Sequence, residues 1–342
     1  MTAREHAGGG APAEAAPRLA GLRLAQIAVD VGATKIAVTL TDDTGGPTAF
    51  RRSTRTVLRS ASSPEAALGE LIKDVCRERH VATARVGSVV VGIPGVIDRQ
   101  SGTIASCPNL PELDGIALGP ALSEWLGMSV HIENDVNVIA LGEATAGRGR
   151  GIADLACVFV GSGIGCGLIL GGELYVGADG IAGEFGHTTV EVNGRQCTCG
   201  SKGCLEMYCS GKALSAWAAA VGLESADVTG WPDEFHGAEG TIRAARQGNR
   251  SAQLALEDAF MYLGVGIANL VNMVNPRLVI LGGGLMTGWP SAIERVGQIV
   301  KARSRLVARD RVQIDAPALG DEAFAIGAAR LAAAGRAVEG AE

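Results

Sequence analysis

The sequence predicts an α/β protein of two similar lobes that face each other across a cleft. Residues 24–40 and 155–170 each have the pattern of a strand, a glycine-containing turn and a second strand. Alternating helical and strand patterns follow each of these hairpins, so the order of the first half restarts in the second. The chain has 342 residues, 47% of them hydrophobic, which is enough for two domains with full cores.

In the first half, short runs of apolar or β-branched residues predict strands at 24–30, 35–40, 53–58, 86–91 and 129–133. Ser62 and Glu65 have the spacing of a helical capping box, and Pro64 suits the first helical turn. The helix that follows has its apolar residues at helical spacing: Leu68, Leu71, Ile72, Val75 and Cys76. A second helix is predicted at 136–146.

The second half repeats this order, with strands predicted at 155–160, 166–170 and 278–281. A glycine turn at 161–165 joins the first two strands, and glycines at 282–284 follow the third. A long helix is predicted at 252–274 and further helices to the C-terminus, whereas 233–240 has the composition of a loop.

These patterns predict a small N-terminal α/β lobe at 24–136, completed by a C-terminal helix at 321–336, and a larger lobe at 137–320. Residues 1–23, rich in Ala, Gly and Pro, and residues 337–342 are predicted to be flexible tails. The N-terminal stretch lacks the apolar run of a signal peptide, and no apolar run reaches the roughly 18 residues of a membrane helix. We expect a cytoplasmic protein that binds neither membranes nor, with a net charge of −6, nucleic acid.

The turn of the first hairpin has residues that suit a phosphate group. Gly32 lets the backbone approach closely with its N–H groups, Thr34 adds a hydroxyl donor, and Asp30 can hold Mg²⁺. An ordinary β-turn favours the same residue types and is the alternative interpretation. Neither a GxxxxGK(S/T) loop nor a GxGxxG motif occurs in the chain.

Gly161, Gly163 and Gly165 alternate in the turn of the second hairpin. Alternating glycines remove the side chains from one face, which favours the close approach of another group. A phosphate that faces the first hairpin across the cleft is one such group. Packing against another part of the backbone is the alternative.

Glu133, Asn134 and Asp135 stand where a predicted strand ends and a helix begins. A carboxylate at a strand end beside a cleft can accept a proton from an attacking hydroxyl. Phosphoryl transfer needs little more from a protein than this base, positioning and charge neutralisation. The alternative is that Asp135 caps the following helix.

One imidazole and three thiols have the spacing H-x9-C-x-C-x4-C and form a complete tetrahedral zinc set of the structural type: His187, Cys197, Cys199 and Cys204. Free thiols that cluster by chance are the alternative. Glu184 and Glu206 flank this loop and can accept hydrogen bonds from a polyol, although surface carboxylates would look the same. The other five of the eight cysteines stand in apolar surroundings and are interpreted as packing residues: Cys76, Cys107, Cys157, Cys166 and Cys209.

From about residue 28 to residue 329, the chain resembles the ROK family of bacterial sugar kinases, glucokinases and related repressors. The matching segments are DVGATK at 30–35, VGIPGVID at 91–98, ENDVNVIALGE at 133–143, GSGIGCG at 161–167, GEFGH at 183–187, CTCGSKGCLE at 197–206 and NPRLVILGGG at 275–284. The order and spacing of the GEFGH and CLE segments are highly specific. The resemblance implies an actin-like ATPase fold, of the ribonuclease H-like kind, with two lobes and a cleft between them.

The resemblance also implies a role for each matching residue, with Asp135 as the general base. The residues implied to bind sugar hydroxyls are Asn109, Asn134, Glu184, His187 and Glu206. Those implied to lie at the phosphates of ATP are Asp30, Gly32, Thr34, Lys35, Gly161, Ser162, Gly163 and Gly165, and those near its adenosine are Gly282, Gly283 and Gly284. His187 would have one ring nitrogen on zinc and the other toward the sugar.

Three departures from the family's pattern are visible. Ala33 replaces the second glycine of DxGGTK and adds a methyl group near the phosphates, while Ser162 replaces the usual threonine and keeps its hydroxyl. Residues 112–114, Glu-Leu-Asp, stand where glucose enzymes of the family often have Gly-Trp, next to Asn109.

The resemblance therefore implies transfer of the γ-phosphoryl group of ATP to a primary hydroxyl of a hexose, first of all to the 6-position of glucose, with Mg²⁺ and a structural Zn²⁺ as cofactors. A kinase for an amino sugar, a deoxy sugar or a C7-cyclitol is one alternative. A non-catalytic sugar-sensing regulator is an alternative of another class. Only about 25 residues precede the first strand, fewer than the helix-turn-helix module of the family's repressors requires, and this favours an enzyme. A homodimer or homotetramer is also implied.

Overall fold

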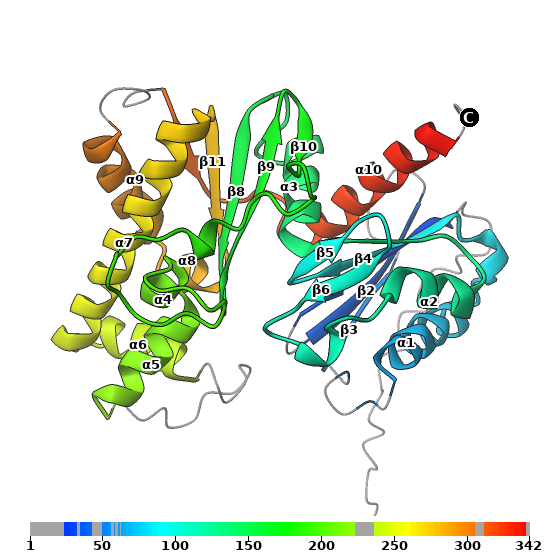
Figure 1. Cartoon of the computed structure of the whole chain (residues 1–342), viewed down its shortest axis with the longest axis horizontal. Helices are drawn as coiled ribbons and strands as arrows, with labels where there is room; N and C mark the ends of the chain where they lie inside the picture. The colour runs from blue at the N-terminus through cyan, green and yellow to red at the C-terminus, as the bar shows by residue number, and fades with distance from the viewer. Residues whose placement is uncertain are drawn as a thin grey trace, which may run out of the picture.

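The computed structural model describes residues 24–32, 35–42, 50–55, 58, 61, 63–222, 236–304 and 311–339. Figure 1 shows two α/β halves, each built around a five-stranded sheet. In spatial order the first sheet consists of β3 (Phe50–Arg55), β2 (Lys35–Asp42), β1 (Leu24–Val31), β4 (Ser88–Ile93) and β7 (Val130–Asn134). The second consists of β10 (Glu173–Tyr175), β9 (Ile164–Leu170), β8 (Leu155–Val160), β11 (Leu278–Gly282) and β12 (Gln313–Asp315).

The two sheets have the same strand order and the same strand directions. In the first sheet, β3, β2 and β1 are antiparallel neighbours, whereas β1, β4 and β7 run parallel. In the second, β10, β9 and β8 are antiparallel and β8, β11 and β12 run parallel. The predicted α/β fold of two similar lobes is confirmed.

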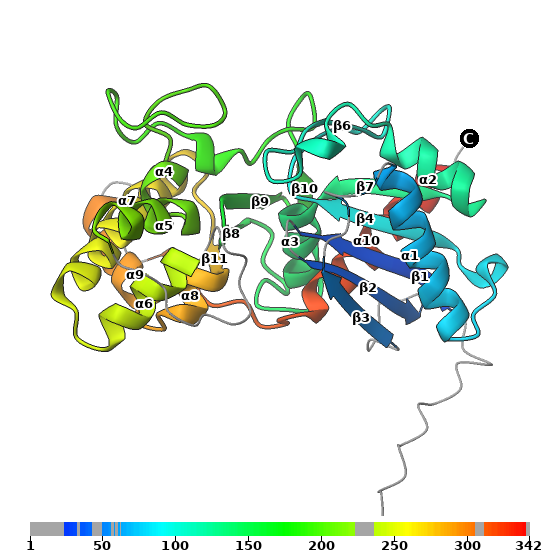
Figure 2. The ribbon, with the colours of Figure 1, turned by 90° about the horizontal axis from the view of Figure 1, so that it is seen from below.

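Helices and one small hairpin complete the two halves. In the first half these are α1 (Pro64–Glu78), α2 (Leu118–Leu126), β5 (Val96–Asp98) and β6 (Thr103–Ser106). In the second they are α4 (Glu206–Cys209), α5 (Gly211–Ala220), α6 (His236–Arg246), α7 (Arg250–Val274), α8 (Gly284–Gly288) and α9 (Ala292–Arg303). Two further helices, α3 (Asp135–Thr145) and α10 (Glu322–Glu339), lie where the halves meet (Figure 2).

The alternation of residues along β1 explains how helices cover both faces of the first sheet. Ile27, Val29 and Val31 are fully buried and belong to one core with apolar residues of α1 and α2. Ala28 points to the opposite face, into a core that includes α3 and α10. Both helices also contribute to a core of the second sheet, so they form a layer that the two sheets share. The predicted lobe boundary at 136–137 falls inside α3, and the lobe limits stay a prediction.

α3 and α10 cross at two glycines. A Cβ atom on Gly142 of α3 would overlap the carbonyl oxygen of Ala323, and one on Gly327 of α10 would overlap that of Val138. The two backbones can approach this closely because neither glycine carries a side chain. This crossing joins the two halves.

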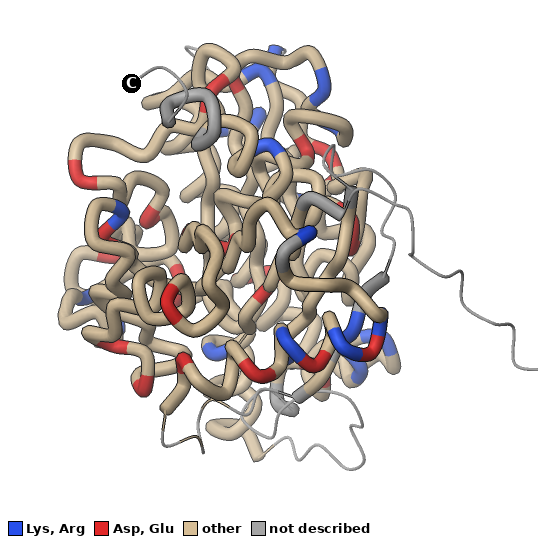
Figure 3. The backbone as a smooth tube through the Cα atoms, turned by 90° about the vertical axis from the view of Figure 1, so that its right-hand side faces the viewer, with Lys and Arg blue, Asp and Glu red and all other residues tan. Residues whose placement is uncertain are grey.

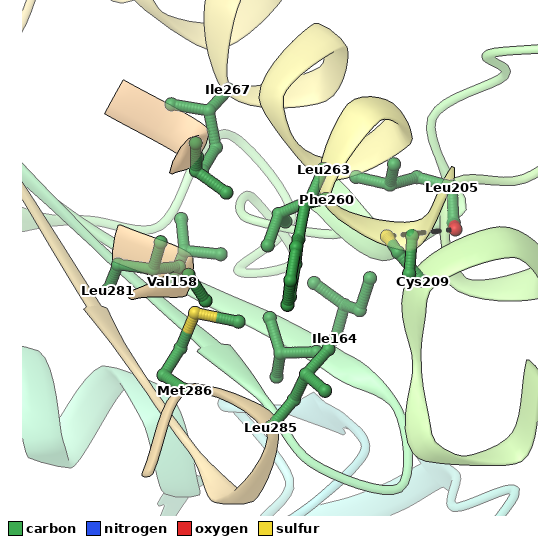
Figure 4. Close-up of a cluster of buried hydrophobic side chains, with 14 of the residues drawn as sticks. Val158, Ile164, Leu205, Cys209, Phe260, Leu263, Ile267, Leu281, Leu285 and Met286 are labelled. Atoms are coloured by element: carbon green, nitrogen blue, oxygen red, sulfur yellow. Dashed lines mark hydrogen bonds between the residues drawn. The ribbon is translucent and has the colours of Figure 1, made fainter. Parts of the chain in front are cut away.

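The second half has a large core between its sheet and α7. Phe260 and Leu263 of α7 pack with Val158 of β8 and Leu281 of β11 (Figure 4). By length and composition alone, α7 is long and apolar enough to cross a membrane, but more than half of its most apolar stretch is buried inside the protein. This core accounts for the apolar character of the helix.

The start of α1 differs from the prediction by one residue. Its N-cap is Ser63, whose Oγ accepts the N–H of Ala66 at 3.3 Å and donates to Glu65 at 2.6 Å. Ser62, the predicted cap, lies outside the described residues, as do the predicted N-terminal tail and the first turn at 33–34.

The predicted loop at 233–240 is wrong from His236 onward, where α6 begins. The helix forms because Ala238, Ile242 and Ala245 recur at helical spacing and are buried. At the C-terminus, α10 extends to Glu339, into the predicted tail. The five cysteines interpreted as packing residues are all buried, which confirms that interpretation.

Acidic and basic positions are interspersed at the end of the molecule that Figure 3 shows. On α1, the exposed Arg77 pairs with Asp74. Such exposed pairs contribute little to stability.

Candidate active site

A cavity of about 600 Å³ is lined by residues from both halves. The parallel strands β4 and β7 end at one edge of the first sheet, and the segments that follow these ends form one side of the cavity. The glycine turn after β8 and Gly283, after β11, belong to the other side. The cavity therefore lies where the carboxyl ends of both sets of parallel strands meet.

Most of the residues predicted to form a site line this cavity: Asn109, Asn134, Asp135, Gly161, Ser162, Gly163, Gly165, Glu184, His187, Cys199, Glu206 and Gly283. The other described ones do not line it: Asp30, Gly32, Lys35, Cys197, Cys204, Gly282 and Gly284. Thr34 lies outside the described residues. The predicted adenosine-side turn thus reaches the cavity only at Gly283.

Asp135 is the first residue of α3 and one of its carboxylate oxygens accepts the N–H of Val136 at 2.9 Å. Burial and, to a smaller extent, the nearby Asp30 carboxylate together raise the pKa of Asp135 to about 7. Asp30 therefore lies close to Asp135 although the two residues are far apart in the sequence. A carboxylate with this pKa is poised to exchange a proton near neutral pH.

Asn134 is the N-cap of α3. Its side-chain oxygen accepts the N–H groups of Val136 at 3.0 Å and Asn137 at 3.2 Å, and its amide nitrogen donates to the carbonyl of Gly95 at 3.3 Å. The capping role considered for Asp135 thus belongs to its neighbour. Asp135 instead lines the cavity.

Glu133 is buried beside these two residues, and its partners were not predicted. Its carboxylate pairs with the Arg99 guanidinium and accepts the side-chain amide of Asn137 at 3.0 Å and the N–H of Asn134 at 2.9 Å. Arg99 follows β5, and its side chain lies against Gly180 of the second half. A buried carboxylate with this many donors holds Asn134 and Asp135 in place.

The alternating glycines of the second hairpin serve different purposes. A Cβ atom on Gly163 would overlap the Glu206 carboxylate, and one on Gly165 would overlap Val136 of α3. At Gly161, in contrast, a Cβ would have nothing within 4 Å. Close packing explains the first two glycines, and only Gly161 leaves open space toward the cavity.

The four predicted metal ligands come together. The ligating atoms of His187, Cys197, Cys199 and Cys204 all lie within 4.8 Å of one another, and the Nδ1 atom of His187 is 3.6 Å from the Cys197 sulfur. Burial raises the pKa of the Cys204 thiol to about 12, whereas the N–H of Ser201 lowers the pKa of Cys199. Three thiolates this close repel one another, and a divalent cation would relieve that repulsion, so the donor set fits Zn²⁺.

His187 connects this cluster to the cavity. Its Nε2 atom, on the side away from Cys197, is 3.8 Å from the Glu184 carboxylate. Burial raises the pKa of Glu184; the His187 ring opposes that shift and Glu206 adds to it. The Oε2 atom of Glu206 in turn accepts the N–H of Ile164 at 3.0 Å. Glu184, His187 and Glu206 form a polar wall next to the four candidate metal ligands.

Asn109 lies on a loop of the first half and is bonded to a residue of the second. The ammonium of Lys212, on α5, donates to the side-chain oxygen of Asn109 at 2.7 Å. The Asp114 carboxylate accepts the N–H of Cys107 and closes this loop. Lys212 lines the cavity but was not predicted.

Sequence comparison identifies relatives of this chain. The family model described as "ROK family" matches residues 26–334. A glucokinase of Streptomyces coelicolor is 33% identical over 323 residues, which is 90% of this chain and 96% of that protein. A putative xylose repressor of Caldicellulosiruptor is 35% identical over 69% of this chain, but the chain spans only 60% of that repressor's length.

Comparison with solved structures gives the same result for the fold. A ROK family glucokinase from Streptomyces griseus, solved in complex with glucose and AMPPNP, is 29% identical with a TM-score of 0.74 and covers 90% of this chain and 99% of its own. A ROK hexokinase from Thermus thermophilus has a TM-score of 0.72 over 92% of this chain and 99% of its own. These likenesses confirm the predicted actin-like fold.

Proposed function

Because this chain belongs to the ROK family, we propose that it is an ATP-dependent sugar kinase that phosphorylates a primary hydroxyl of a hexose. The observation that carries the proposal is the composition of one cavity, which holds both Asp135 and the open turn at Gly161. A carboxylate with a pKa near neutral can accept the proton of a sugar hydroxyl. The open turn at Gly161 leaves room for a phosphate group. Glucose, phosphorylated at its 6-position, is the first candidate, because both a sequence relative and a structural relative are glucokinases.

In the proposed reaction, Asp135 accepts the proton of the sugar hydroxyl while the hydroxyl oxygen forms a bond to the γ-phosphorus of ATP. The bond from that phosphorus to the bridging oxygen breaks, and ADP leaves with the electron pair. Asp135 then releases its proton to solvent. The products are the sugar phosphate and ADP.

The remaining residues of the site would bind and orient the two substrates. The sugar hydroxyls would be held by Asn109, Asn134, Glu184, His187 and Glu206. The phosphates would be held by backbone groups and side chains at Asp30, Gly32, Thr34, Lys35, Gly161, Ser162, Gly163 and Gly165, with Gly282, Gly283 and Gly284 toward the adenosine. Together, the sugar-binding and the nucleotide-binding residues would align the sugar hydroxyl with the γ-phosphorus of ATP.

Two metal ions fit the residues present. Mg²⁺ would be held by Asp30 and the phosphates, since Asp30 already raises the pKa of Asp135 and their mutual repulsion favours a cation, and it would neutralise phosphate charge. Zn²⁺ would be held by His187, Cys197, Cys199 and Cys204 and would stiffen the loop that carries the sugar-binding groups.

A regulator that senses a sugar without turning it over is the second candidate, favoured by the match to repressors. The chain spans 60% and 66% of two of them, so the likeness covers a part of each. If the protein is an enzyme, an amino sugar, a deoxy sugar or a C7-cyclitol is an alternative phosphate acceptor.

We further propose that the protein is a cytoplasmic homodimer or homotetramer that binds neither nucleic acid nor membranes.

The test is a coupled assay of ADP release with Mg-ATP against a panel of hexoses, amino sugars, deoxy sugars and cyclitols. Turnover on glucose that exceeds turnover on every other compound supports a glucokinase. Turnover only on another class keeps the mechanism and changes the acceptor. Sugar binding by calorimetry without turnover on any compound would contradict the kinase and support the regulator.

A further inference from the structure

Lys212 is the one Lys or Arg among the described residues that line the cavity. The acidic residues of the same lining are Glu133, Asp135, Glu184 and Glu206, and of these Glu133 is paired with Arg99. Phosphates that enter this cavity meet an excess of negative charge. A cation among these groups therefore attracts a bound phosphate more strongly than a cation on the water-exposed surface would.

The main chain of Lys212 is fixed to the turn that carries Gly161. The N–H of Gly211 donates to the carbonyl of Gly161 at 2.8 Å, and the N–H of Lys212 donates to the carbonyl of Ser162 at 3.3 Å. A Cβ on Gly211 would lie 2.9 Å from the Gly161 carbonyl oxygen, so this approach depends on the glycine. The Lys212 side chain thus starts from a defined point beside the proposed phosphate site.

The position of Lys212 on α5 is unfavourable for a cation. Lys212 is the second residue of the helix, after the buried N-cap Ser210. The N-terminus of a helix carries partial positive charge, which disfavours a lysine there and favours an anion. An anion that binds beside Lys212 would offset this unfavourable electrostatic interaction of the ammonium with the helix end.

The Lys212 ammonium has a neutral partner within the described residues. It donates one hydrogen bond, of 2.7 Å, to the amide oxygen of Asn109 on the opposite half. An ammonium has three donors, and a hydrogen bond to a phosphate oxygen is stronger than one to an amide. Exchange of this partner for a phosphate is therefore favourable.

We propose that Lys212 binds the phosphoryl group as it passes from ATP to the sugar, and afterwards binds the phosphate of the product. The inference rests on the proposed kinase function and adds a catalytic residue to it. In the absence of phosphate the same ammonium bonds to Asn109 and joins the two halves. When phosphate is present it neutralises charge that develops during transfer.

The test is steady-state kinetics and calorimetry on the full chain with Lys212→Met, Lys212→Arg and the control Lys301→Met, an exposed lysine on α9. We expect Lys212→Met to lower kcat by about 100-fold while the KM for the sugar changes by less than about threefold. Lys212→Arg should recover part of kcat because it keeps the charge. The control should behave as the unaltered protein does.

Measurements of sugar and sugar-phosphate binding distinguish this role from a purely structural one, in which Lys212 only joins the two halves through Asn109. Lys212→Met should bind the sugar as the unaltered protein does and bind the sugar phosphate on the order of tenfold more weakly. If the variant raises only the KM for the sugar, or keeps kcat within about threefold of the unaltered enzyme, the inference is wrong while the kinase stands. If the unaltered protein shows no sugar-dependent ATP turnover, the proposed function fails and the inference fails with it.

Discussion

At the scale of single residues, the environment of Asp135 decides what the cavity can do. Its carboxylate is partly buried and lies near Asp30, and both effects disfavour the charged form. An aspartate in water is almost fully ionised at neutral pH and is a weak base. Burial beside another carboxylate makes Asp135 a stronger base at the pH of a cell.

This shift predicts the pH dependence of the reaction. Since the base must be unprotonated, kcat/KM should fall about tenfold per pH unit as the pH drops below about 7, the pKa of Asp135. An aspartate with its ordinary pKa of 3.8 would keep the rate constant down to about pH 5. Initial rates from pH 8 to pH 5.5 measure this, with circular dichroism as a control for folding. A flat profile across the range would show that Asp135 is not the titrating base.

The sequence predicts residues of this site better than their partners. Asp135 and the metal ligands stand in motifs whose spacing is local, and they come together as expected in the cavity and the cluster. The partner of Glu133 is Arg99 and that of Asn109 is Lys212, which are 34 and 103 positions away. The first contact depends on how the loop after β5 folds back onto β7, and the second on how the two halves pack, and no local pattern contains either.

At the scale of elements, the turn between β8 and β9 shows that two explanations of one pattern can both apply. The alternating glycines indicated either a ligand or close packing. Gly163 and Gly165 make room for Glu206 and Val136, whereas Gly161 faces open space. Periodicity identified the face of the strand but not what covers each position.

The cysteine loop gives a prediction about metal. Cys199→Ser should lower the zinc content below one atom per chain and raise the KM for the sugar, because His187 belongs to both the metal cluster and the cavity wall. Elemental analysis and kinetics measure the two effects. Ser201→Ala is the matched control, since this exposed serine lies in the same loop. Full activity in a Cys199→Ser protein without zinc would contradict the structural role.

The crossing of α3 and α10 gives a prediction about stability. Gly327→Ala would push a methyl group into the carbonyl of Val138, and we expect a loss of about 1–3 kcal/mol in the free energy of unfolding. Gly297→Ala on α9 is the control, because a Cβ there has open space and alanine favours a helix. Urea denaturation measures both variants. Equal stability of Gly327→Ala and the unaltered protein would show that the helices can move apart.

The strongly apolar strands and the long helix α7 were predicted, whereas the shortest strands and α6 were not. The apolar strand predicted at 155–160 is β8, residue for residue. In contrast β10 and β12 have three residues each, too few for any period to be visible. α6 was missed because its glycines obscured a buried face of small residues.

At the scale of the whole molecule, the site of the proposed function follows from the repetition of one sheet. Two hairpins in the sequence predicted two lobes, and the sheets repeat the same order of strands. The repetition brings the carboxyl ends of two sets of parallel strands to one cavity. One set contributes Asp135 and the other contributes Gly161. The sequence predicted these contributions, but not that α3 and α10 would belong to both halves.

The central claim is that this cavity transfers phosphate with Asp135 as the base. The measurement that tests it most directly is sugar-dependent ADP release by the unaltered protein and Asp135→Asn, with sugar binding by calorimetry on both. We predict that the variant loses at least about 100-fold in kcat and binds the sugar within about threefold of the unaltered protein, because the substitution keeps the shape of the side chain and removes only its basicity. Turnover by Asp135→Asn close to that of the unaltered enzyme would contradict the claim.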